Sequence, residues 1–98
     1  MKQTDIDFFK EELAPLLESF NLEYRTYAGG DLGNLEQVVF DTLKLGGNFD
    51  FWENGWLGVF VYDYVTDSIM FNNMFDAKEQ HKNELKDVVD MILSRNIN

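Results

Sequence analysis

Cysteine is absent from the 98-residue sequence, which excludes disulfide bonds, thiolate catalysis and cysteine-ligated zinc. Long apolar runs are absent too, because the longest apolar stretches are only a few residues, far below the ~20 that span a bilayer. Residues 1–7 lack the basic stretch and apolar run of a signal peptide. We therefore expect a cytoplasmic protein that does not enter a membrane.

Basic residues are scarce, with 8 Lys and Arg against 18 Asp and Glu, for a formal charge of -10. Nucleic acids and anionic membranes are recognised by clustered Lys and Arg, so the sequence argues against both as partners. The acidic excess lies in residues 1–76, because residues 77–98 carry four acidic and four basic side chains. The excess charge serves either solubility or attraction to a basic protein.

Residues that carry chemistry are few and scattered. His81 is the only histidine, and Glu84 alone accompanies it at helical spacing, so we expect a surface or boundary histidine rather than a ligand or base. None of the serines lies in a Gly-x-Ser-x-Gly motif. We therefore predict no catalytic, metal-binding or cofactor-binding residue, no cofactor and no small-molecule substrate.

Hydrophobic residues make up 45% of the chain, which suffices for one core, and we expect a single domain over residues 1–98. A helix is predicted over residues 4–20, capped by Thr4. Pro15 lacks an N–H, so a kink or break is expected near Ala14. The predicted buried stripe of this helix is Phe9, Leu13, Leu16, Leu17 and Phe20.

Alternating apolar residues predict five strands, at 22–28, 35–45, 49–53, 56–64 and 69–75. Residues 46–48, Gly-Gly-Asn, are expected to form a three-residue turn. Asn54-Gly55 is expected to form a two-residue type I′ turn, whose two central residues need positive φ. Thr66-Asp67 supplies the last turn.

A second helix is predicted to begin at Asp76, because Asp76-Ala77-Lys78-Glu79 resembles a capping box. Its apolar stripe is Leu85, Val88, Val89, Ile92 and Leu93. The fold class is therefore α+β: an antiparallel β-meander of about five strands flanked by an N-terminal and a C-terminal helix, in the order α-β-β-β-β-β-α.

The expected turns set the register and so divide the side chains between two faces. The first face, taken as the core under the helices, collects Val39, Leu43, Leu45, Phe49, Phe51, Phe60, Tyr62, Ile69, Phe71 and Phe75. The second face collects Val38, Phe40, Thr42, Lys44, Asp50, Trp52, Leu57, Val59, Val61, Asp63, Met70, Asn72 and Met74.

The second face has an apolar centre and charged edges, including an expected cross-strand pair between Lys44 and Asp50. Either one helix packs on each face, or both helices cover the first face and the second face meets another chain. Trp52 is the best candidate for a binding anchor, since Trp is enriched among interface hot spots. The predicted protein-interaction residues are Trp52, Leu57, Val59, Val61, Met70, Met74, Asp50 and Asp63.

These features favour a non-enzymatic acidic protein-interaction module that inhibits a basic partner, as immunity proteins and antitoxins do. One alternative is a self-associating structural domain, in which the second face forms a homodimer interface. Another is a nucleic-acid mimic that blocks a DNA- or RNA-binding protein, although the neutral last helix argues against carboxylates over the whole surface.

Overall fold

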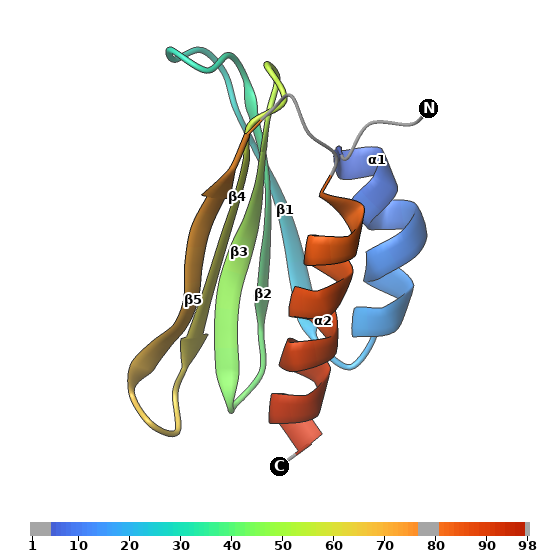
Figure 1. Cartoon of the computed structure of the whole chain (residues 1–98), viewed down its shortest axis with the longest axis vertical. Helices are drawn as coiled ribbons and strands as arrows, with labels where there is room; N and C mark the ends of the chain where they lie inside the picture. The colour runs from blue at the N-terminus through green and yellow to red at the C-terminus, as the bar shows by residue number, and fades with distance from the viewer. Residues whose placement is uncertain (1–4, 77–80, 98) are drawn as a thin grey trace.

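Five antiparallel strands form one sheet in a computed structural model that describes residues 5–76 and 81–97 (Figure 1). Each strand pairs with its neighbours in sequence, so the sheet is a meander with β1 and β5 at its edges. The predicted α+β fold class is confirmed. The strands are β1 (Asn21–Tyr27), β2 (Leu35–Asp41), β3 (Leu45–Trp52), β4 (Leu57–Asp63) and β5 (Ser68–Phe75).

The N-terminal helix consists of three consecutive segments of different pitch: α1 (Ile6–Phe8), a π-helical η1 (Phe9–Leu13) and a 3₁₀-helical η2 (Ala14–Leu17). The side chain of Asp5 caps it by accepting the amide of Phe8, whereas the predicted cap, Thr4, lies outside the described residues. The change of pitch at Ala14 agrees with the break predicted there. Pro15, near the start of η2, has no N–H for a regular α-helical bond.

The C-terminal helix, α2 (Lys82–Ile97), begins later than predicted. Asp76 is not helical, and its carbonyl oxygen lies 3.0 Å from Nε2 of His81. The rest of the predicted capping box, residues 77–79, lies outside the described residues. His81 is buried against the ring of Phe75, with ring centroids 4.7 Å apart, so the expected surface or boundary position is wrong.

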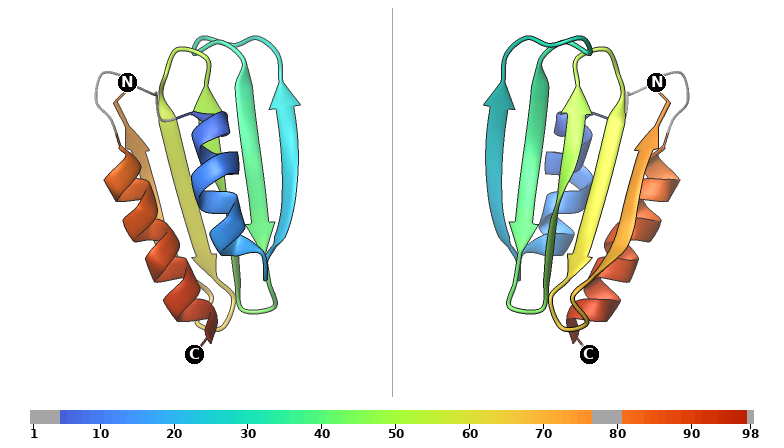
Figure 2. Two further views of the ribbon diagram at one scale, coloured as in Figure 1. Left: turned by 90° about the vertical axis from the view of Figure 1, so that its right-hand side faces the viewer. Right: turned by 90° about the vertical axis from the view of Figure 1, so that its left-hand side faces the viewer.

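Both helices pack on the same face of the sheet, which is the second of the two arrangements considered above (Figure 1, Figure 2). The N-terminal helix contributes Phe9, whose ring lies 5.1 Å from Phe49 and 6.1 Å from Phe51. The C-terminal helix lies on the β5 side and buries the apolar side chains of Leu85, Val88, Val89 and Ile92. Within the described part of the chain, neither helical element has the length and apolarity to cross a membrane.

The β2–β3 turn lies at Thr42, Leu43 and Lys44, not at the predicted residues 46–48. The amide of Thr42 donates to the carbonyl of Leu45 at 2.8 Å, and the Thr42 hydroxyl accepts the amides of Lys44 and Leu45. Gly46 and Gly47 therefore belong to β3. A Cβ atom at Gly47 would lie 1.9 Å from the carbonyl oxygen of Phe60, so only glycine fits this close approach of two strands.

Between β3 and β4, the amide of Trp52 donates to the carbonyl of Trp56 at 3.0 Å. This bond closes a loop of three residues, Glu53, Asn54 and Gly55, instead of the predicted two. The amide of Gly55 donates to the carbonyl of Trp52 at 2.9 Å, and Gly55 has a φ of 99°. This combination is a β-turn followed by a left-handed glycine, the usual three-residue hairpin loop. Leu57 consequently pairs with Phe51 rather than with Trp52.

A register shift by any odd number of residues turns every side chain of a strand to the other side of the sheet. The earlier β2–β3 turn and the longer β3–β4 loop both shift the register in this way. The predicted side is therefore wrong for β2 and β4. Under the helices lie Val38 and Phe40 of β2 and Leu57, Val59 and Val61 of β4, all at most 2% exposed. The predicted positions of Leu45, Phe49, Phe51, Phe71 and Phe75 on the core side are correct.

Candidate interaction surface

The side of the sheet away from the helices, the open face, is covered by neither helix (Figure 1). Strand pairing arranges much of it as three rows that each cross all five strands. The first row is Arg25, Gln37, Asp50, Gly58 and Met74. The second is Glu23, Val39, Asn48, Phe60 and Asn72. The third is Asn21, Asp41, Gly46, Tyr62 and Ile69. Polar, acidic and apolar side chains alternate over this surface, unlike the uniformly apolar centre under the helices.

An aromatic row, Trp52, Phe60, Tyr62 and Tyr64, runs along β4 on the open face. The rings of Phe60 and Tyr62 stack with centroids 6.4 Å apart, and Tyr62 and Tyr64 lie 5.9 Å apart. Trp52, Phe60 and Tyr62 are partly buried, and Tyr64 is 49% exposed. The row therefore places four partly or largely exposed aromatic side chains along one line of the open face.

Two glycines hold the ends of the aromatic row close to the sheet. A Cβ atom at Gly58 would lie 3.1 Å from Cζ3 of Trp52, so the indole ring packs directly over this backbone. At the other end, a Cβ atom at Gly46 would lie within contact of the Tyr64 hydroxyl, at 2.3 Å. The indole of Trp52 and the phenol of Tyr64 thus lie against glycine backbone, where a Cβ atom would collide with them.

Beside the aromatic row, a polar cluster is centred on Asp50. Its Oδ1 accepts hydrogen bonds from Nε2 of Gln37 at 2.8 Å and from Nδ2 of Asn48 at 3.0 Å. The predicted pairing of Asp50 with Lys44 is wrong, because Lys44 lies in the β2–β3 turn and donates to the carbonyl of Ile97. Both partners of Asp50 are neutral, so its negative charge is not compensated locally.

Charges on the open face are mainly acidic. Glu23 forms an ion pair with Arg25, which is the one basic side chain among the described strand residues of this face. Asp67, in the β4–β5 turn, accepts a hydrogen bond from the hydroxyl of Tyr62. That hydrogen bond, with burial and the charge of Asp67 adding to it, raises the pKa of Tyr62 above its ordinary value.

The predicted interaction residues divide between the two sides of the sheet. Trp52, Asp50 and Met74 lie on the open face, and Met74 is 50% exposed. Met70 occupies the irregular position of β5 and packs against the core. The expectation of a shared exposed face is wrong for the remaining four, which are buried on the helix side: Leu57, Val59, Val61 and Asp63.

Sequence reasoning placed Phe60 and Tyr62 in the core and so missed the aromatic row. The one-residue error at the β3–β4 turn caused this, because Phe60 and Tyr62 alternate with Val59 and Val61. A signal was present in the sequence. Gly55 follows Glu53 and Asn54, and a glycine at the third loop position also fits the three-residue loop.

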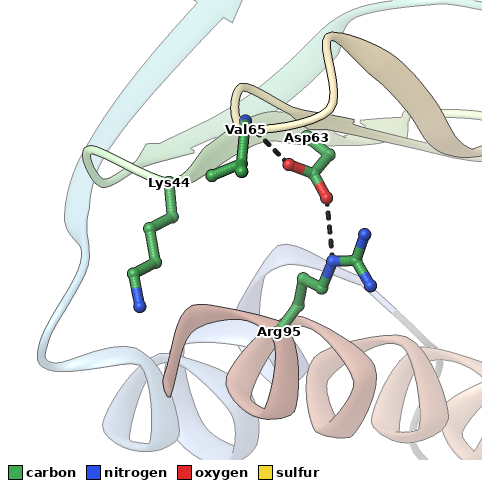
Figure 3. A pocket seen from close by; sticks show the side chains of 4 residues that line it. All are labelled: Lys44, Asp63, Val65 and Arg95. Atoms are coloured by element: carbon green, nitrogen blue, oxygen red, sulfur yellow. Dashed lines mark hydrogen bonds and ion pairs between the residues drawn. The ribbon is translucent and has the colours of Figure 1, made fainter. Parts of the chain in front are cut away.

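Asp63 instead anchors the end of α2 beside a hollow of about 160 Å³ lined by Lys44, Asp63, Val65 and Arg95 (Figure 3). Its Oδ2 accepts Nε of Arg95 at 2.8 Å, and its Oδ1 accepts the amides of Val65 and Thr66. Burial alone would raise the pKa of Asp63, but these hydrogen bonds together outweigh burial and hold the pKa below its ordinary value. The buried carboxylate thus accepts three hydrogen bonds that link α2 to the β4–β5 turn.

Comparison of the chain with protein-family models, with curated proteins and with solved structures found no match. Among residues 5–76 and 81–97, no three acidic or histidine side chains are grouped so that they could hold a metal ion.

Proposed function

We propose that this chain is a non-enzymatic acidic protein-interaction module that binds a basic protein through its open sheet face. One observation carries the proposal: an aromatic row lies on a sheet face that neither helix covers, in surroundings that are mainly acidic. The solvated face of an antiparallel sheet is normally polar, whereas this one exposes Trp, Phe and Tyr at its centre.

The composition of the open face supports a protein partner. Interfaces combine an aromatic centre with a polar rim, and Trp and Tyr are enriched among the residues that contribute most binding free energy. Trp52 and Tyr64 lie over glycine backbone, so their rings lose little side-chain freedom when a partner packs against them. Apolar surface around them, such as Met74 and Ile69, is half exposed or more.

The sign of the charge supports a basic partner. Glu23, Asp41, Asp50 and Asp67 contribute four carboxylates at or beside the open face, against the one guanidinium of Arg25. The whole chain adds a formal charge of -10, which steers a cationic protein toward it. The surface of the partner that meets this face would carry clustered Lys and Arg, and such surfaces commonly bind phosphate groups. This chain would inhibit the partner by covering that surface.

The cytoplasm is the compartment we propose, because a cysteine-free chain needs no oxidising environment.

Site-specific photo-crosslinking tests the proposal in the native host. A photoreactive phenylalanine analogue replaces Phe60 on the open face, and a matched variant carries it at Asp87, which is exposed on α2. We expect the Phe60 position to form a crosslink with a protein of net positive charge that the Asp87 position does not form. The purified partner is then titrated with the wild-type chain and with Trp52→Ala.

Trp52→Ala is expected to weaken binding of that partner about 30-fold, corresponding to about 2 kcal/mol for a buried aromatic anchor. Added salt is expected to slow association, because opposite charges steer the encounter. Met91→Ala on α2, which lies away from the open face, serves as the control and should bind like wild type. The proposal would be refuted if crosslinks formed only from position 87, or if the crosslinked protein carried a net negative charge. It would also be refuted if Trp52→Ala bound the partner as tightly as the wild type.

A further inference from the structure

β5 is an edge strand without a single charged side chain. Its eight residues, Ser68–Phe75, pair with β4 on one side only, so backbone N–H and C=O groups of the other side have no strand partner among residues 5–76 and 81–97. Ile69 is 57% exposed and Met74 is 50% exposed. Edge strands of soluble proteins normally carry charged residues, proline or bulges that prevent pairing with another chain.

The two edges of the sheet differ in this respect. β1 carries Glu23 and Arg25, which form an ion pair on the open face. β5 has one irregularity, where its register shifts opposite Val61 and Tyr62, and this lies toward the Ser68 end. Residues 71–75 remain regular, uncharged and free of proline. The protection found at β1 is thus missing over most of β5.

Charge is also balanced in the helix beside this edge. α2 lies on the β5 side of the sheet (Figure 2) and carries three acidic residues, Glu84, Asp87 and Asp90, against three basic ones, Lys82, Lys86 and Arg95. β5 and α2 therefore have no net charge, and the formal charge of -10 belongs entirely to the rest of the chain. Two copies of so acidic a chain repel each other least when these sides meet.

We propose that two copies of this chain associate through antiparallel pairing of their β5 strands. An antiparallel strand is complementary to a second copy of itself, so one two-fold axis closes the interface and leaves no further β5 edge exposed. The sheets of the two copies then join into one, with both helix layers on the same side. This inference does not depend on a basic partner, because it uses none of the aromatic row.

Sedimentation equilibrium with a pair of matched variants tests the inference. Asn72→Lys with Met74→Lys places two positive charges on exposed open-face positions of β5, where the same residues of a second copy would repel them. Asn21→Lys with Tyr27→Lys makes the same change at exposed open-face positions of β1. Both variants lower the net negative charge equally, so only the position of the lysines differs between them.

We expect the wild type and the β1 variant to approach twice the 11.5 kDa chain mass as concentration rises, and the β5 variant to keep the monomer mass. Hydrogen exchange of the wild type adds a test that needs no substitution, because β5 amides should become more protected with concentration while β1 amides do not. A monomer at every concentration overturns the inference. A dimer that survives in the β5 variant, or that the β1 variant also loses, overturns it as well.

Discussion

Replacing Phe49 and Phe60 separately by alanine distinguishes the two sides of the sheet. The two residues lie on neighbouring strands, since Phe60 pairs with Asn48, and the sequence predicted that both belong to the core. In the structure, Phe49 is 0% exposed on the helix face, whereas Phe60 is partly exposed on the open face. We expect Phe49→Ala to destabilise the fold far more than Phe60→Ala.

The difference follows from what surrounds each ring. Phe49 packs against Phe9 and Phe40, with ring centroids 5.1 and 5.3 Å away, so its truncation leaves a closed cavity. Truncation of a buried phenylalanine costs about 3–5 kcal/mol, because lost burial and the cavity both contribute. At Phe60, water enters the vacated space, so only part of the transfer free energy is lost, about 1 kcal/mol. We therefore expect the variants to differ by about 2 kcal/mol or more.

Urea unfolding monitored by circular dichroism measures this difference. With the slope usual for small domains, the midpoints of the two variants should differ by about 1 M or more in urea. Phe49→Leu, a milder change, keeps the comparison possible if Phe49→Ala does not fold, and it should still lose more stability than Phe60→Leu. Equal losses at the two positions, or a greater loss at Phe60, would show that the assignment of the two faces is incorrect.

Two further predictions concern the strand glycines and the buried carboxylate. Gly47→Ala should lower the free energy of unfolding by about 3 kcal/mol, because its Cβ would lie 1.9 Å from the backbone carbonyl oxygen of Phe60. Urea unfolding measures this loss. A loss no larger than that of Gly46→Ala would contradict the prediction. Gly46→Ala should cost less, since the side-chain hydroxyl of Tyr64 can move aside. Asp63 has a folded-state pKa below its ordinary 3.8, so its contribution to stability is complete above pH 3.8 and is lost as the pH falls through the lower folded-state pKa. Asp63→Asn should therefore show a shallower fall in unfolding free energy with acid than wild type, and an equally steep fall would contradict this.

Periodicity in the sequence predicted the number and order of the elements, and the two sides of β3, correctly. Residues such as Phe49 and Phe51 alternate clearly with polar neighbours, and this pattern alone identifies their buried side. The break before Pro15 was predictable for the same kind of local reason, because a missing N–H disrupts a helix wherever it occurs.

The sides of β2 and β4 could not be obtained in the same way. Both alternating sets of β4 are apolar, with Val59 and Val61 on one side and Phe60 and Tyr62 on the other, so the pattern does not choose between them. The turn decides, and the residues before β4 fit a two-residue and a three-residue loop equally well by local preference. The loop that forms is the one whose register lets β4 pack against the helices. The residues of the hairpin alone do not reveal that long-range packing.

The side of the sheet predicted for each candidate residue was correct or wrong according to its strand. Trp52 was placed correctly because it belongs to β3, whose side was predicted correctly, whereas Leu57, Val59 and Val61 followed the error in β4. The apolar content of both alternating sets left two arrangements open, and a face that neither helix covers was one of them. Which aromatic side chains of β4 are exposed depended on whether the β3–β4 loop has two or three residues.

Hydroxyl-radical footprinting of the complex with the crosslinked partner tests the binding role of the open face most directly. Oxidation of the aromatic row, Trp52, Phe60, Tyr62 and Tyr64, should fall when the partner binds, because these exposed or partly exposed rings become covered. Oxidation of Met91 and Leu93 on α2 should stay the same. Unchanged oxidation of the aromatic row, with protection confined to the helices, would show that the partner binds elsewhere and would contradict the proposed function.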